Sequence, residues 1–202
     1  MNKIIKYSKS YKKIDEIKSD FTSLNSIFLN KVKKINKIYK KQPIRKNCKI
    51  CNSTNLQSFI LSFGIEYRIC KNCSHLNGKY QDTKKFANLV YKDDFEEMYA
   101  KSYKKDFNKR VKYIYTPKIK FLKKVIKKKI KLIDIGSGHG HLIKACQNLN
   151  VNAVGFEVSK KLVNLAKNKL RTNSIFHVDP NKIPETIIKD KTSNVISLIG
   201  VL

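Results

Sequence analysis

Two pairs of cysteines stand in the first half of the chain. Cys48 and Cys51 form one C-x-x-C pair, Cys70 and Cys73 form the other, and eighteen residues separate the pairs. A C-x-x-C turn directs two thiolates towards one point, and this spacing is typical of sites that hold Zn²⁺ with four thiolates. Four protein ligands leave no open position on the metal, so we predict a structural zinc site.

Disulfide bonds are the competing interpretation of the four cysteines. They need an oxidising compartment, and the first residues, MNKIIKYSKSYKK, contain no apolar stretch typical of a secretory signal. We therefore expect a cytoplasmic protein with reduced cysteines. His75 is close enough to replace a cysteine ligand but is expected at the surface, and Cys146 is expected to be a small buried side chain.

A glycine-rich turn is the second chemical feature. Residues 132–140 read LIDIGSGHG, a short apolar run followed by glycines at positions 136, 138 and 140. Glycine permits a positive φ and allows a ligand to lie against the backbone. A helix expected over about 140–149 would add unpaired N–H groups at its start. The turn therefore predicts a nucleotide-type cofactor site.

Two cofactor classes use such a turn, and the glycine spacing distinguishes them. A dinucleotide-binding turn has the pattern G-x-G-x-x-G, which would require glycine where this chain has His141. The chain has G-x-G-x-G, with Asp134 two residues before the first glycine. A carboxylate at Asp134 is unfavourable beside a diphosphate and favourable beside an amino group and a sulfonium.

Two more acids end the strands that we expect next. Glu157 ends a strand expected over 151–157, and Asp179 ends a strand expected over 174–179. The carboxyl ends of parallel strands share one edge of a sheet. Glu157 can accept two hydrogen bonds from vicinal ribose hydroxyls there, and Asp179 can meet an adenine amino group. We expect the three acids to line one pocket.

The elements that must position these residues alternate between strand and helix. Apolar runs at 132–135, 151–157, 174–179 and 194–200 are separated by helical patterns at about 140–149, 159–170 and 184–190. Short apolar runs with few polar interruptions are typical of parallel strands that helices cover on both faces. The fold class is therefore predicted to be α/β.

The segments LIDIGSGHG, GFEVSKKLVNLAK and NVISLIGVL resemble the class I S-adenosylmethionine-dependent methyltransferases. The resemblance covers residues 131–202 and implies a Rossmann-like parallel sheet that binds S-adenosylmethionine. It places Asp134, Gly136, Ser137, Gly138 and Gly140 around the methionine part, Glu157 at the ribose and Asp179 near the adenine. Family domains continue beyond the fourth strand, so residues 131–202 are expected to be the N-terminal half of a truncated domain. No general base is assigned, and neither His139 nor His141 is expected to be one.

The order of the two modules is similar to that in bacterial polysaccharide and deoxysugar biosynthesis methyltransferases. A zinc ribbon there precedes the methyltransferase domain, which implies a sugar or nucleotide sugar as the small-molecule acceptor. A zinc ribbon also precedes the methyltransferase domain of certain enzymes that modify ribosomal RNA. An RNA-binding protein or an RNA methyltransferase is therefore the alternative.

The formal net charge of +29 is compatible with a nucleic-acid partner. Residues 1–47 carry +11 and residues 101–131 carry +13 of this charge. Only 4 of the 44 basic residues are arginine, the residue that reads bases most often, and lysine, isoleucine and asparagine are all favoured by AT-rich codons. We expect most of the lysines to be solvated surface residues.

The remaining segments are expected to be helical. Apolar residues three and four apart over 11–41 predict an amphipathic helix that packs against the protein or forms a homodimer, with attachment to a lipid surface as the less favoured alternative. The predicted organisation is a basic helical segment at 1–43, a zinc ribbon at 44–80 with a hairpin around Gly64, an aromatic-rich helical connector at 81–130 and the cofactor domain at 131–202. No apolar run is long enough to span a membrane.

Overall fold

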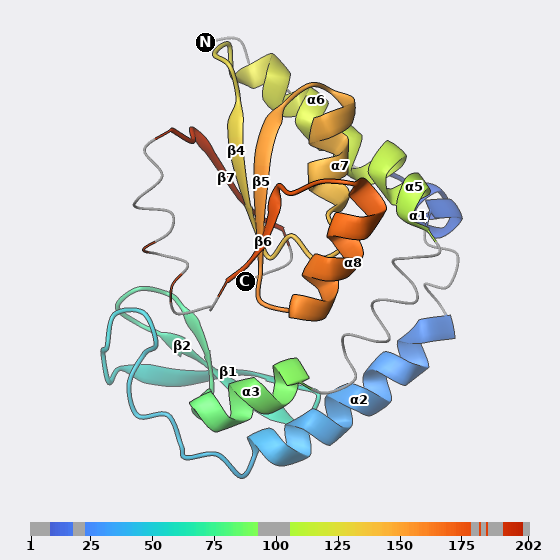
Figure 1. Cartoon of the computed structure of the whole chain (residues 1–202). Helices are drawn as coiled ribbons and strands as arrows, with labels where there is room; N and C mark the ends of the chain where they lie inside the picture. Colours follow the sequence, from blue (N-terminus) through green and yellow to red (C-terminus); the bar gives the residue numbers. More distant parts are fainter. Residues whose placement is uncertain are drawn as a thin grey trace. The chain divides into compact units, whose positions relative to one another are not determined.

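The computed structural model describes residues 9–17, 23–92, 106–178, 182, 185 and 192–199. The chain divides into two compact units, one of residues Asp20–Glu96 and one of residues Met1–Ser19 together with Glu97–Leu202 (Figure 1). Asp179 and, apart from Glu185, the expected helix near 184–190 lie outside the described residues.

The unit Asp20–Glu96 contains two helices and a small antiparallel sheet. Helix α2 spans Ser23–Tyr39 and helix α3 spans Lys84–Lys92. Strands β1 (Leu56–Ser62), β2 (Ile65–Cys70) and β3 (Leu76–Gly78) pair in the order β1-β2-β3. The hairpin predicted around Gly64 is confirmed, whereas the third strand was not expected, because its three residues carry no alternation that the sequence could show.

The β1–β2 hairpin closes through a two-residue turn. Ser62 pairs with Ile65, and the two residues between them, Phe63 and Gly64, have φ values of 47° and 76°. Two positive φ values are typical of a type I′ turn, whose twist matches that of the flanking strands. The turn, together with a register shift between Ser58 and Ile60, sets the pairing of Leu56 with Cys70 at the cysteine end of the hairpin.

Helix α2 is joined to the rest of its unit through Tyr39. The buried Tyr39 ring lies 5.5 Å from the Tyr80 ring and 5.1 Å from the Phe86 ring, measured between centroids. Its hydroxyl donates a hydrogen bond of 2.5 Å to the carbonyl of Tyr80. Phe28, Val32 and Ile35 are partly buried, so the apolar stripe predicted from residue spacing is the covered face of this helix.

The other unit contains a parallel four-stranded sheet. Its strands are β4 (Lys131–Ile135), β5 (Asn152–Glu157), β6 (Ile175–His177) and β7 (Val195–Leu198), in the order β6-β5-β4-β7. Helices α7 (His141–Asn148) and α8 (Lys160–Leu170) connect the first three strands. The predicted α/β class with a parallel sheet is confirmed.

Helical segments precede this sheet. They are α1 (Tyr11–Ile17), α5 (Phe107–Arg110), the π-helix η1 (Val111–Tyr115) and α6 (Thr116–Val125). The helix expected over 11–41 is thus described as two helices, α1 and α2, which belong to different units. The π-helical turn was not predicted, since no residue pattern distinguishes it from α-helix.

The order of the strands creates a switch point at β4. The chain runs from β4 to β5 and β6 on one side, and then places β7 against the opposite edge of β4. Leu132, Ile133, Asp134 and Ile135 are all buried, as expected for a central strand. Ligands of open parallel sheets bind outside the carboxyl ends of the strands at such a point. A ligand of this sheet is therefore expected beside the residues that follow Asp134.

Candidate functional site

The glycine turn follows the carboxyl end of β4, and its backbone adopts positive φ values that favour glycine. Gly136, Gly138 and Gly140 have φ values of 70°, 51° and 74°. The backbone N–H groups of Gly136 and Ser137 donate to the carbonyl of Phe156 at 2.8 and 3.1 Å. These bonds tie the turn to β5, so its amide groups have fixed positions.

The glycines of this region differ in the space around them. A Cβ atom on Gly140 would lie 2.6 Å from Leu170 Cδ1 and 2.8 Å from Ile175 Cδ1, so Gly140 is required by packing. A Cβ on Gly155 would lie 2.7 Å from the Ser137 hydroxyl oxygen. A Cβ on Gly138 would meet no atom within 4 Å. Open space therefore faces Gly138 alone among these three, and a ligand can approach the backbone there.

Asp134 lies at the switch point and is 4% exposed. The hydroxyl of Ser197 on β7 donates to its carboxylate at 2.6 Å. Burial raises the pKa of Asp134 to about 6; the nearby charge of Glu157 adds to this effect, and the Ser197 hydroxyl and the Lys118 ammonium oppose it. A positively charged ligand group beside Asp134 would favour its ionised form.

Glu157 ends β5 and is 7% exposed. One carboxylate oxygen accepts a 2.7 Å hydrogen bond from the N–H of Gly138, and the other accepts a 3.0 Å bond from the N–H of Ser159. An ionised carboxylate has about four acceptor sites, so capacity remains for two hydroxyl donors. The structure thus brings Asp134, the glycine turn and Glu157 together at one edge of the sheet.

Ser137 contributes a second polar group to this edge. Its hydroxyl oxygen is buried and has no hydrogen-bond partner within the described part of the chain. Buried polar groups in proteins are normally paired. The Ser137 hydroxyl is therefore a group that a ligand can satisfy, and Ser137 is one of the residues that the sequence resemblance places around the methionine part of the cofactor.

His139 in the turn and His141 at the start of α7 are both buried, and His141 is packed against aromatic rings. His141 is 3% exposed and its ring lies 4.5 Å from Phe107 and 5.3 Å from Tyr115, measured between centroids. Burial lowers the pKa of His139 to about 4, assisted by the charges of Lys169 and Arg110. The sequence did not indicate that Phe107 and Tyr115 from the preceding helices would cover His141.

The four predicted cysteines form a cluster in the other unit. Their sulfur atoms all lie within 4.8 Å of one another, with 3.6 Å between Cys48 and Cys73 and 3.5 Å between Cys51 and Cys70. A tetrahedron with Zn–S bonds of about 2.3 Å has edges of about 3.8 Å. None of the cysteines in the described part forms a disulfide, and His75 is not a member of the cluster. The donor set therefore fits a tetrahedral metal ion.

The two cysteine pairs adopt the same turn. The N–H of Asn52 donates to the carbonyl of Cys48 at 3.1 Å, and the N–H of Ser74 donates to the carbonyl of Cys70 at 2.8 Å. Asn52 and Ser74 each follow the second cysteine of their pair, and both have φ of 59°. This repetition shows that both turns are shaped to direct two sulfur atoms to one point.

Hydrogen bonds favour the ionised form of Cys48. Burial acts to raise the pKa of this thiol, but the N–H groups of Cys51 and Ile50 and the side-chain amide of Asn77 lower it to about 5. Thiolates are the form that binds metals. By contrast, burial raises the pKa of Cys146 to about 12, and this fully buried thiol behaves as the small apolar side chain that was expected.

A comparison with protein-family models agrees with the fold. A family model described as a methyltransferase domain matches residues 107–202, so this part of the chain is a methyltransferase domain. The match begins at Phe107, before β4, the first strand of the parallel sheet, and thus includes the helical segments whose rings contact His141. This family implies S-adenosylmethionine as the methyl donor. The search of curated proteins found no match.

A solved structure with a similar chain is a SAM-dependent methyltransferase from Archaeoglobus fulgidus. The sequence identity is 14% and the TM-score is 0.33, over 46% of this chain and 38% of that protein. The present chain therefore corresponds to about 38% of the length of that methyltransferase. In the described residues, no helix is long and apolar enough to cross a membrane.

Proposed function

We propose that this chain transfers a methyl group from S-adenosylmethionine to a small-molecule acceptor. The observation that carries the proposal is the convergence of Asp134, the glycine turn and Glu157 at the switch point of the sheet. The two carboxylates are buried, yet each has remaining acceptor capacity at the edge where ligands of this fold bind. A nicotinamide dinucleotide would place a diphosphate near Asp134, which its charge opposes.

The residues present fit the donor. Asp134 would hold the amino group of the methionine part, the Ser137 hydroxyl and the backbone at Gly138 would line its carboxylate end, and Glu157 would accept hydrogen bonds from the ribose hydroxyls. Asp179 is proposed at the adenine. When bound, S-adenosylmethionine supplies a methyl group that the sulfonium already activates. The task left to the protein is to orient donor and acceptor and to exclude water.

The four-cysteine cluster is proposed to hold Zn²⁺ through Cys48, Cys51, Cys70 and Cys73. Its support is the mutual sulfur distances, which fit a tetrahedron, and the matching turns of the two cysteine pairs. Four thiolates leave no position for substrate. The metal would therefore stabilise the small antiparallel sheet instead of taking part in methyl transfer.

The acceptor that we propose is a sugar or nucleotide sugar. The proposal is supported by the sequence resemblance, in which a cysteine module precedes a methyltransferase domain in polysaccharide and deoxysugar biosynthesis enzymes. A hydroxyl acceptor would need a general base to take its proton.

RNA is the second candidate acceptor, and one observation favours it. A hollow of about 400 Å³ is lined by Lys123, Lys127, Lys128 and Lys129 and lies beside the amino ends of β4 and β5. Lysines placed together attract the phosphate groups of RNA, and their binding releases the counterions that were held by those phosphates. Affinity for RNA that falls steeply between low and high salt would favour this candidate, and the absence of measurable RNA binding would remove it.

Calorimetric titration of the chain with S-adenosylmethionine tests the proposed donor. We expect binding by the wild-type chain, at least tenfold weaker binding by the Glu157→Ala variant, and no binding of NAD⁺ by either. The Glu185→Ala variant is a matched control that removes a carboxylate with no assigned role. Equal affinities for the wild-type chain and Glu157→Ala would reject the ribose assignment, and preferential binding of NAD⁺ would reject the function.

A further inference from the structure

Asn77 is a buried polar residue beside the cysteine cluster, and no sequence pattern identified it. It lies in the middle of the short strand β3 and is 2% exposed, whereas its neighbour Leu76 is 44% exposed. A buried amide needs hydrogen-bond partners for both its oxygen and its nitrogen. The partners of Asn77 identify what this side chain does.

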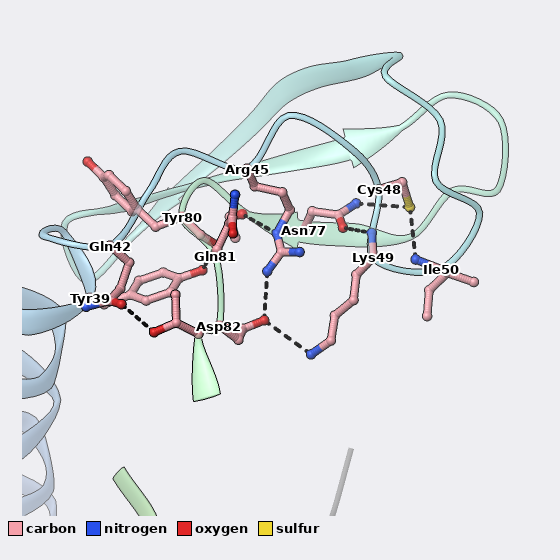
Figure 2. Close-up of polar contacts among 12 residues, drawn as sticks. Tyr39, Gln42, Arg45, Cys48, Lys49, Ile50, Asn77, Tyr80, Gln81 and Asp82 are labelled. Carbon is pink, nitrogen blue, oxygen red and sulfur yellow. Dashed lines mark hydrogen bonds and ion pairs between the residues drawn. The ribbon is translucent and has the colours of Figure 1, made fainter. Parts of the chain in front are cut away.

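The Asn77 side chain joins the two cysteine turns. Its amide nitrogen lies 3.5 Å from the sulfur of Cys48 and donates at 3.0 Å to the carbonyl of His75. Its oxygen accepts a 2.9 Å hydrogen bond from the N–H of Lys49. Figure 2 shows the Asn77 side chain pointing towards the loop of Cys48 and Lys49, with dashed lines to both residues. One side chain therefore contacts the first turn at two adjacent residues and the second turn just beyond Cys73.

This contact distinguishes Cys48 from Cys70, its counterpart in the second turn. The N–H of Ile50 donates to the Cys48 sulfur at 3.5 Å. Backbone N–H groups lower the pKa of both thiols, those of Cys51 and Ile50 at Cys48 and those of the equivalent residues of the other turn at Cys70. In the part of the chain that the structure describes, only Cys48 also has a side-chain amide donor. The additional donor breaks the symmetry of two otherwise equivalent turns.

Lys49 is held at two points: its backbone N–H donates to Asn77, and its side chain pairs with Asp82. The Lys49 ammonium lies 3.2 Å from Asp82, which in turn pairs with the Arg45 guanidinium at 2.8 Å (Figure 2). Arg45 donates from its Nε to the carbonyl of Gly78 at 3.3 Å. Lys49 is therefore fixed at both ends against β3 and the segment that follows it.

We propose that Asn77 is a positioning residue of the metal site: its amide donates to the Cys48 thiolate while its oxygen holds the Lys49 N–H, which fixes the direction of the Cys48 sulfur. This inference rests on the proposed zinc site. A divalent ion with four thiolates leaves two net negative charges on the cluster, and N–H donors to sulfur stabilise that charge. Residues that hydrogen-bond metal ligands change metal affinity by about 10–100-fold when they are replaced.

An amide is suited to both contacts at once. A neutral side chain with a donor and an acceptor can serve a thiolate and a backbone N–H simultaneously. Aspartate at position 77 would keep the acceptor for Lys49 but would set a carboxylate oxygen against the thiolate. Leucine would remove both contacts at similar volume. Comparison of the two variants therefore distinguishes the effect of losing the N–H donor to Cys48 from the effect of losing the oxygen that accepts from Lys49.

The test measures metal retention by the full chain. Wild type, Asn77→Asp and Asn77→Leu are loaded with Zn²⁺, and transfer of the metal to a chromophoric chelator is followed. Asn55→Asp and Asn55→Leu are the matched controls, because Asn55 is an exposed asparagine of the same unit outside the cysteine cluster. We expect about 10–100-fold weaker metal binding in both Asn77 variants and no change in the controls. Retention by Asn77→Asp equal to that of wild type would overturn the role of the donor.

Cobalt substitution supplies a readout that a purely structural role would not move. With Co²⁺ in the site, the sulfur-to-metal charge-transfer bands report the electron density on the thiolates. We expect the bands of the Asn77 variants to shift to lower energy, since the thiolate of Cys48 loses a hydrogen-bond donor. Bands identical to those of wild type would contradict the inference.

A measurement on the unmodified chain covers the case in which both variants fail to fold. When ¹¹³Cd²⁺ replaces the metal, its nuclear spin couples through each ligating sulfur to the protons that are hydrogen-bonded to that sulfur. We expect a correlation between the metal and a side-chain amide proton of Asn77, and its absence while the backbone correlations are present would reject the inference. If the wild-type chain binds neither Zn²⁺ nor Co²⁺, the proposed zinc site itself fails.

Discussion

The carboxylate of Glu157 accepts a hydrogen bond of 2.7 Å from the backbone N–H of Gly138, nineteen residues earlier in the chain. The same carboxylate accepts from the N–H of Ser159 at the start of α8. Glu157 therefore joins the end of β5 to the turn after β4 and to the helix that follows. A group proposed to bind the ribose also stabilises the site in the absence of ligand.

Removing the Glu157 carboxylate is expected to destabilise the methyltransferase domain. The Glu157→Ala variant leaves the N–H groups of Gly138 and Ser159 without their acceptors in a part-buried position. Loss of such a partner costs about 1–3 kcal/mol per buried group. Chemical denaturation followed by circular dichroism should show a decrease in the free energy of unfolding of this order. Glu157→Gln keeps one acceptor oxygen and should lose about half as much. An unchanged denaturation curve for Glu157→Ala would show that water replaces the carboxylate.

Alanine at Gly138 and at Gly140 should have different effects. At Gly140 the new Cβ would meet Leu170 and Ile175 at less than 3 Å, and φ is 74°, so overpacking and a left-handed backbone together should cost about 2–5 kcal/mol. At Gly138 the Cβ enters open space, and only the backbone cost of about 1–2 kcal/mol applies.

The measurement that separates the two glycines is donor binding by the folded variants. Gly138→Ala should remain folded and should bind S-adenosylmethionine at least tenfold more weakly, because its Cβ occupies the space assigned to the ligand. Gly140→Ala should mainly lower the denaturation midpoint. The reverse pattern, with full binding by Gly138→Ala, would show that the ligand lies elsewhere.

The buried Asp134 predicts a pH dependence of stability. Its folded-state pKa is raised from 3.8 to about 6 by burial, so between these values the folded domain holds a proton that the unfolded chain has lost. The stability contributed by protonated Asp134 is therefore present below pH 3.8 and is lost as the pH rises to about 6. The total loss is about 3 kcal/mol at 1.36 kcal/mol per unit.

The comparison that isolates Asp134 is the difference in unfolding free energy between wild type and Asp134→Asn. Asparagine does not titrate, so it should gain stability relative to wild type as the pH rises from 4 to 6, and the difference should level off above this range. Addition of S-adenosylmethionine should reduce the gain, because a cationic amino group favours the ionised carboxylate. A difference that does not vary with pH would contradict the shifted pKa.

The sequence predicted those parts of the molecule that local patterns encode. The strands around the glycine turn and the clustering of the four cysteines were predicted because apolar runs, glycines and cysteine spacing are local signals. The partners that complete each site come from distant segments. Ser197 reaches Asp134 from a strand sixty-three residues later, and Asn77 reaches Cys48 from twenty-nine residues later. A serine and an asparagine are common residues, and only pairing of the strands gives them these neighbours.

A different limit applies to Asp134 and Glu157. Their positions at strand ends followed from the alternation of apolar runs, but their interactions did not. The sequence predicted that Glu157 would face a ligand, and the structure adds its bonds to Gly138 and Ser159. The path of the glycine turn past the end of β5 determines these bonds, and turn geometry depends on tertiary contacts such as those between Gly155 and Ser137.

The turn between β1 and β2 offers a stabilising substitution. Phe63 has φ of 47° and is 64% exposed. This combination is unfavourable, because a large side chain is strained at positive φ and the exposed ring gains little stabilisation from packing. Asparagine tolerates this conformation, and Asn-Gly is the preferred pair of a type I′ turn. Phe63→Asn should raise the free energy of unfolding of this unit by up to about 1 kcal/mol.

Phe63→Ala is the control for the Phe63→Asn substitution, since it removes the ring without supplying a residue that favours positive φ. The backbone carbonyl of residue 63, which accepts a hydrogen bond from Asn36, is retained in both variants. Thermal unfolding of the zinc-loaded chain should therefore give a higher midpoint for asparagine than for alanine. If alanine is equal to or better than asparagine, then the exposed ring, and not the backbone conformation, determines the stability of this turn.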